Sequence, residues 1–213
     1  ECIAALETAD TKVTASSATV TISDNAGTAV TAANLSTIGG ATTGTVTVSN
    51  AVAISGTTAE CIAALETADT KVTASSATVT ISDTPSITNV NTIAGAAGVV
   101  TATLGADSLS NLGDLTTGAT DVITVTVNDT TGTAVTAANL SALGGKTAGT
   151  VTVSNAVAIS GTAAECIAAL ETADTKVTAS SATVTISDTP SITNLNTIAG
   201  ATNGVVTATL DAD

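Results

Sequence analysis

Hydrophobic and polar residues alternate in short runs along the whole chain, and these runs return at regular intervals. Residues 45–48 and 150–153 both read Thr-Val-Thr-Val, and a period of two with β-branched residues predicts a strand with one buried face. Between such runs lie apolar pairs three positions apart, for example Leu140 and Leu143. This spacing predicts a short helix with one inward face. Each unit is therefore expected to hold one short helix and one or two short strands.

The sequence repeats itself on two scales. Residues 29–97 match residues 134–202 at an offset of 105, and the segment ECIAALETADTKVTASSATVTISD begins at residues 1, 60 and 165. A shorter unit of 22–32 residues recurs inside this long repeat. An Asn or Cys before each predicted helix marks it, at Cys2, Asn34, Cys61, Asn89, Asn111, Asn139, Cys166 and Asn194.

Periods of this length are typical of stacked repeats, in which each unit contacts only its neighbours. We therefore expect a repeat solenoid: a parallel β-solenoid of about eight coils forming a single domain over residues 1–213. Each strand would pair in register with its equivalent in the next coil, about 4.8 Å away.

The Asn/Cys marker column is predicted to be a structural ladder. Both side chains are compact, and both bond to nearby backbone groups, so they suit an ordered turn before the helix. The chain resembles leucine-rich repeats at this column and in repeat length, although the LxxLxLxxN spacing is absent.

A second column is predicted to be an exposed ladder of threonines, Thr14, Thr47, Thr73, Thr103, Thr126, Thr152, Thr178 and Thr209. Threonine is a good exposed strand former, and neighbouring threonines stack favourably. The T-x-T array also resembles the ice-binding face of insect and bacterial antifreeze proteins, which implies ice binding as an alternative. Lys12, Lys71 and Lys176 interrupt the array two residues earlier.

Composition narrows the function. The chain has a formal net charge of −14, four lysines, and no histidine or aromatic residue. Nucleic-acid binding depends on Lys and Arg, so we expect no nucleic-acid partner. No apolar run is long enough to insert in a membrane. Without a base beside the three cysteines, we expect buried free thiols and no enzyme activity.

Calcium is the only cofactor that the sequence leaves open. Asp107 and Asp114 lie in the run GADSLSNLGDL, and oxygen-rich turns suit calcium in surface repeat proteins. The GGxGxD nonapeptide of calcium-binding RTX repeats is absent. We therefore expect no cofactor, with a calcium-binding or adhesive surface module as the alternative.

The Thr/Ala/Ser/Val-rich texture, with near-identical segments such as ISGTAAECIAALETADTKVTASSATVTISDTP, resembles large repeat proteins of bacterial and especially cyanobacterial cell surfaces. That resemblance implies an extracellular structural protein of a filament, sheath or surface fibre. Neither end of the sequence resembles a polar capping coil. Two interpretations fit: the sequence is a window from a longer array, or copies stack end to end. We expect the second, a contact that produces filaments.

Overall fold

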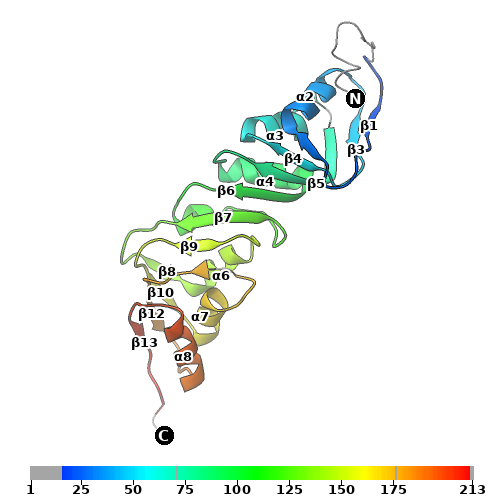
Figure 1. Ribbon diagram of the computed structural model, residues 1–213. Helices are drawn as coiled ribbons and strands as arrows, with labels where there is room; N and C mark the ends of the chain where they lie inside the picture. The colour runs from blue at the N-terminus through cyan, green and yellow to red at the C-terminus, as the bar shows by residue number, and fades with distance from the viewer. Residues whose placement is uncertain (1–15, 71, 176, 212–213) are drawn as a thin grey trace. The chain divides into compact units, whose positions relative to one another are not determined.

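The computed structural model describes residues 16–70, 72–175 and 177–211 (Figure 1). The chain divides into two compact units, Glu1–Thr103 and Leu104–Asp213, called unit 1 and unit 2 below. Cys2 and Thr14, which the sequence assigns to the two ladders, lie outside the described residues.

Two parallel ladders of strands run through unit 1. The first joins β1, β3 and β5, and the second joins β2, β4, β5 and β6. The described elements are β1 (Val20–Ile22), β2 (Ala29–Thr31), α2 (Ala32–Gly40), β3 (Val46–Val48), β4 (Ala53–Gly56), α3 (Thr58–Leu65), β5 (Val72–Ile81), α4 (Ile87–Ala96) and β6 (Ala97–Thr103). Strand β5 is long enough to join both ladders, since Val72 pairs with Val46 and Val79 with Ile54.

Unit 2 repeats this plan. Its first ladder joins β7, β9 and β11, and its second has the order β13-β12-β10-β8. The described elements are α5 (Leu109–Leu112), β7 (Val122–Val127), β8 (Ala134–Thr136), α6 (Ala137–Gly144), β9 (Val151–Val153), β10 (Ala158–Gly161), α7 (Ala163–Leu170), β11 (Val177–Thr178), β12 (Thr183–Ile186), α8 (Ile192–Gly200) and β13 (Val206–Thr207).

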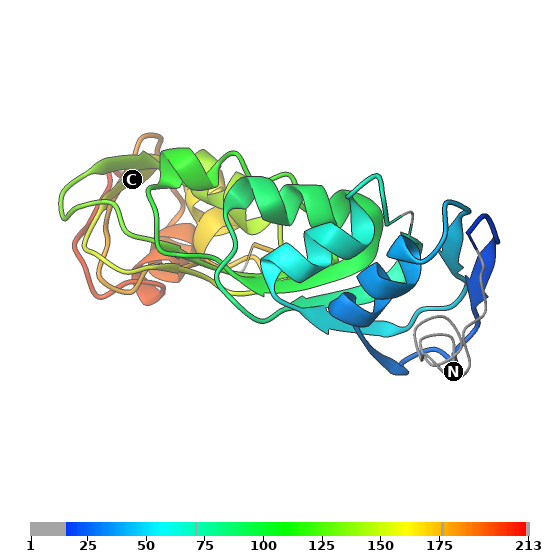
Figure 2. The same ribbon diagram turned by 90° about the horizontal axis from the view of Figure 1, so that it is seen from above.

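Equivalent residues of successive repeats stack on one another, which confirms the predicted alternation of short helices with parallel strands. Val125, Val151 and Val177 pair in register along the first ladder of unit 2, and all three are buried. The helices of a unit lie along one side of its strands (Figure 2). Valine, isoleucine, leucine and alanine fill the narrow core between them, so no aromatic residue is needed.

Glycines let adjacent repeats approach closely beside the helices. A Cβ at Gly144, near the end of α6, would overlap the carbonyl oxygen of Thr175 in the next repeat. A Cβ at Gly149, before β9, would overlap the carbonyl oxygen of Ile123 in the preceding repeat. Both contacts are with backbone, which cannot move aside as a flexible side chain can.

Candidate functional site

The Asn and Cys markers occupy two different helical positions. Each described Asn marker stands three residues after the N-cap Ser or Thr, and its backbone N–H donates to that hydroxyl, as Asn139 does to Thr136. In α3 and α7 this position is taken by Glu60 and Glu165. Cys61 and Cys166 follow one residue later and are buried.

The structure therefore places these markers in two columns rather than the single column predicted. The Asn column, which contains Asn34, Asn89, Asn111, Asn139 and Asn194, lies in the first turn of the helices. The two cysteines stand at the inward position that Leu35 occupies in α2 and Leu140 in α6. The capping box T-x-x-E before each cysteine is the sequence signal that sets this register.

The threonine positions fall in both ladders of strands. Thr47 pairs with Thr73 in unit 1, and Thr126, Thr152 and Thr178 pair in unit 2, all at least partly exposed. The neighbour of Thr47 on its other side is Thr21. Thr103 ends β6, which pairs with the second half of β5, and Thr209 follows β13.

A second exposed column was missed by the sequence analysis. It contains hydroxyl residues paired in register on the second ladder: Thr31, Ser55, Thr80 and Thr101 in unit 1, and Thr136, Ser160, Thr185 and Thr207 in unit 2. Alternation at residues 53–55 and 158–160 was the available signal, but alanine in place of one threonine weakened it.

Aspartates after the strands hold the helix of the preceding repeat. Asp83 Oδ1 accepts from the N–H of Thr58 at 2.7 Å and from its hydroxyl at 2.6 Å. Asp188 accepts from Ala163 N–H at 2.8 Å, and Asp129 from Leu109 N–H at 2.7 Å. A carboxylate is favourable at a helix N-terminus, where backbone N–H groups lack partners. The Thr58 hydroxyl, followed by its N–H, lowers the pKa of Asp83.

Buried threonines join the repeats beyond the C-terminal ends of the helices. The hydroxyl of Thr147 donates toward the carbonyls of Asp121 and Ile123 in the preceding repeat, at 3.0 and 2.8 Å. It also accepts from the N–H groups of Ile123 and Gly149, at 2.7 and 2.8 Å. Thr42 and Thr202 occupy the equivalent positions and donate to carbonyls of the repeats before them.

Asparagine amides make a third kind of contact between repeats. Asn50 Nδ2 donates to the carbonyls of Ser23 and Asp24, at 3.3 and 2.8 Å. Asn155 repeats this arrangement in unit 2 with the carbonyls of Asn128 and Asp129, at 3.2 and 2.9 Å. These amides bond to loop carbonyls that are not part of a strand ladder.

The two described cysteines are poor nucleophiles. Burial, with the nearby charges of Glu60 and Asp83, raises the pKa of Cys61 to about 11. Burial, with Glu165 and Asp188, also raises the pKa of Cys166. The thiolate is the reactive form, so both thiols are protonated at neutral pH.

Asp107 and Asp114 lie on either side of α5. Asp107 Oδ1 accepts from the N–H of Ser108 at 2.7 Å and from the amide of Asn111 at 2.9 Å. Asp114 lines a groove between α5 and α6. Among the described residues, no three His, Cys, Asp or Glu side chains gather where they would hold a metal ion.

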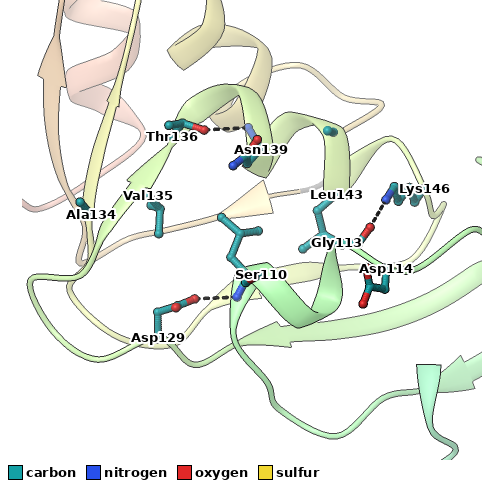
Figure 3. Close-up of a pocket in the computed structure, with 12 residues that line it drawn as sticks. Ser110, Gly113, Asp114, Asp129, Ala134, Val135, Thr136, Asn139, Leu143 and Lys146 are labelled. Atoms are coloured by element: carbon teal, nitrogen blue, oxygen red, sulfur yellow. Dashed lines mark hydrogen bonds between the residues drawn. The ribbon is translucent and has the colours of Figure 1, made fainter. Parts of the chain in front are cut away.

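That groove lies within unit 2 and has a volume of about 580 Å³ (Figure 3). Residues of β8, α5 and α6 line it. Lys146 Nζ donates to the carbonyl of Gly113 across it, and Asp129 stands at the other end. A groove of about 570 Å³ beside β2 and α2 contains the corresponding residues of the earlier copy, including Asp24, Val30 and Asn34.

No protein-family model, curated protein or solved structure matches this chain. None of the helices in the described ranges is long and apolar enough to span a bilayer.

Proposed function

We propose that this protein is a structural scaffold, built as a parallel β-solenoid, that self-associates into a filament, sheath or surface fibre outside the cell. One observation carries the proposal: the polar side chains that recur along the chain are used to join one repeat to the next. Asp83, Thr147 and Asn155 each represent a contact of this kind that is present in more than one copy.

Such contacts favour a mechanical role over a chemical one. Each of these contacts holds one part of a repeat in place against the neighbouring repeat. The aspartates bind the start of a helix, the threonines bind the corner between a helix and a strand, and the asparagines bind a loop. In stacked repeats, the free energy of unfolding is approximately the sum of the intrinsic stability of each repeat and the interface energies between neighbouring repeats. Repeated links between neighbours therefore stabilise an elongated array, whereas a catalytic site needs a few groups that converge on one substrate.

Self-association is supported by apolar side chains on the last described repeat. Ile192 is 67% exposed, Val205 69% and Leu210 48%. In helix α8, Ile198 is buried and the other residues are at least partly exposed. Three large apolar side chains exposed on one repeat favour an interaction surface there, and a second copy of the chain offers repeats of matching outline.

The location outside the cell rests on the resemblance to bacterial surface repeat proteins. The low lysine content and net charge of −14 are compatible with it, since a strongly charged surface keeps a protein soluble until specific contacts form.

Electron micrographs and light scattering of the purified 213-residue chain test the proposal. We expect filaments whose length increases with protein concentration. Discrete particles of constant mass across a hundredfold concentration range would contradict it.

Ice binding is a second candidate, favoured by the two exposed columns of hydroxyl residues. Thr152 and Thr178 pair in register and are exposed. Thermal hysteresis with shaped ice crystals would support this function. For the adhesive or calcium-dependent alternative, the test is a rise in melting temperature on adding calcium.

A further inference from the structure

Strand β8 has an open edge. In the second ladder of unit 2 its partner is β10, and it is the last strand in the order of that sheet. The carbonyl of Thr133 accepts from Ala158 N–H. In a parallel strand, the backbone N–H and C=O groups of successive residues point to opposite neighbouring strands. The backbone groups of Val135, like those of Thr133, therefore point to β10, and those of Ala134 point to the open side. An edge of this kind is a template for another strand.

The preceding repeat covers the edge of β7 but not that of β8. Leu104 and Asp107 donate their N–H groups to carbonyls of Thr124 and Thr126 in β7, at 3.0 and 3.1 Å. The chain then enters α5 at its N-cap, Ser108, with no strand in between. Within the described part of unit 2, the repeat that contains α5 therefore contributes no strand to the second ladder beside β8.

The groove of Figure 3 lies beside this open edge. Leu109, Val135 and Leu143 supply its apolar lining, and Lys146 and Asp129 stand near its ends. In this ladder the inward positions of successive strands are Val135, Ile159 and Val184, each buried. The groove and the open edge of β8 therefore fit an extended segment that directs an aliphatic side chain inward.

A segment of this kind is exposed in the same unit. Residues 205–210 read VVTATL, and β13 ends within them at Thr207 (Figure 1). The same six letters occupy residues 99–104. There the final residue, Leu104, is 5% exposed and bonds to the edge of β7, whereas its counterpart Leu210 is 48% exposed. The sequence thus already binds a strand edge once in this protein.

We propose that residues 205–211 of one copy bind as an added parallel strand along the open edge of β8 in a second copy, with Leu210 in the groove. This contact rests on the self-association proposed above and assigns its two surfaces. Addition of a strand to a sheet edge is a common mode of peptide recognition, with backbone bonds providing affinity and pockets providing specificity. Because donor and acceptor are different surfaces, the contact is heterologous and links copies in series.

Two substitutions remove one surface each. Ala134→Pro removes the N–H directed at the open edge and leaves the bonds to β10 in place; proline is tolerated on edge strands. Leu210→Lys places a charge on the donor segment. Ala29→Pro makes the same change in β2, which is also the last strand of its ladder, so a loss of assembly with Ala29→Pro in place of Ala134→Pro would overturn the assignment to β8. The matched control for Leu210→Lys is Val122→Lys, which changes an exposed apolar residue of β7.

Sedimentation velocity over a concentration series is the readout, with circular dichroism to verify folding. We expect Ala134→Pro and Leu210→Lys each to raise the protein concentration needed for assembly by at least roughly tenfold, because each removes part of a strand-edge contact. The Val122→Lys control should assemble like the unmodified chain. An excess of synthetic peptide with the sequence of residues 203–211 should inhibit assembly of the unmodified chain, and the same peptide with lysine at position 210 should not.

Mixing the two defective variants gives the most specific result. Ala134→Pro retains its donor segment and Leu210→Lys retains its open edge, so the mixture should form a one-to-one complex that does not extend. Assembly of either variant at the unmodified concentration, or a mixture without complex, would overturn the strand-addition contact while leaving self-association in place. A wild-type chain that stays monomeric throughout would overturn both.

Discussion

At the scale of single residues, an aspartate or threonine in this protein acts mainly on the repeat next to its own. Asp83 differs from its equivalents because it binds a hydroxyl as well as a backbone N–H, the hydroxyl coming from Thr58. In the equivalent contact of Asp188, the helix residue is Ala163. The two copies therefore provide a natural comparison of the same contact with and without one hydrogen bond.

Thr58→Ala tests that difference through pH. The pKa of Asp83 is lowered from 3.8 in the folded protein. Its bonds therefore stabilise the fold fully above that value, and the contribution is lost as the pH falls through the lowered folded pKa. We expect the variant to lower the free energy of unfolding in urea at neutral pH, and the difference from wild type to shrink at about pH 2.

Ala163→Thr is the matching gain-of-contact variant, and it should stabilise unit 2 with the same dependence on pH. An equal difference between Thr58→Ala and wild type at both pH values would show that the substitution acts through packing alone.

The thiol of Cys61 provides a second test at this scale. Its pKa of about 11 and its burial predict slow alkylation in the folded protein. In a variant with Cys2→Ser and Cys166→Ser, iodoacetamide should modify Cys61 at a rate that increases steeply with denaturant. Native labelling as fast as that of a free thiol peptide would contradict the buried position.

At the scale of elements, the spacing between repeats is set by backbone contacts beside the helices. Gly144→Ala should destabilise the protein by about 1–3 kcal/mol, because its Cβ would meet the backbone of Thr175. Gly145→Ala is the control, since its Cβ would be 3.6 Å from the nearest atom, the Ser141 carbonyl oxygen, and its φ is −67°. Urea unfolding should show little change or slight stabilisation in the control. Equal losses in both variants would contradict the close approach of the repeats.

The threonine corner is the second test at the scale of elements. Thr147→Val keeps the shape of the side chain but leaves buried backbone groups of Ile123 and Gly149 without their partner. We expect a loss of about 1–3 kcal/mol in the free energy of unfolding, the usual cost of a buried unsatisfied group. Thr152→Val, on the exposed face of β9, should change stability by less than about 0.5 kcal/mol.

Much of the element plan could be predicted because the segments repeat almost letter for letter. Register could not. Val13-Thr14 and Val20-Thr21 have the same pattern, and the predicted threonine column placed Thr14 next to Thr47, whereas the structure pairs Thr21 with Thr47. Identical Val-Thr pairs carry no information about which ladder they join, because the length of the connecting loop and the packing of the next repeat decide this.

The candidate site shows the same limit. The Asn and Cys markers were aligned by type, yet the N-cap threonine determines the helix phase and moves Cys61 into the core. Contacts between repeats, such as Asp83 with Thr58, join residues 25 positions apart. No local pattern predicts them, and they became visible when the neighbouring repeats were placed side by side.

At the scale of the whole molecule, each unit is a stack of repeats that bond to their neighbours, and we propose that copies of the chain continue the stacking. A fibre formed in this way has its strands perpendicular to its axis, so its layers repeat at the strand spacing. Lateral association alone would produce aggregates without that order along the axis.

X-ray diffraction from an aligned sample of the assembled protein measures this order directly. Stacking along the axis predicts a meridional reflection near 4.8 Å, the spacing of parallel strands stacked along the fibre. Aligned fibres that lack this reflection, or that place it on the equator, would contradict stacking along the axis.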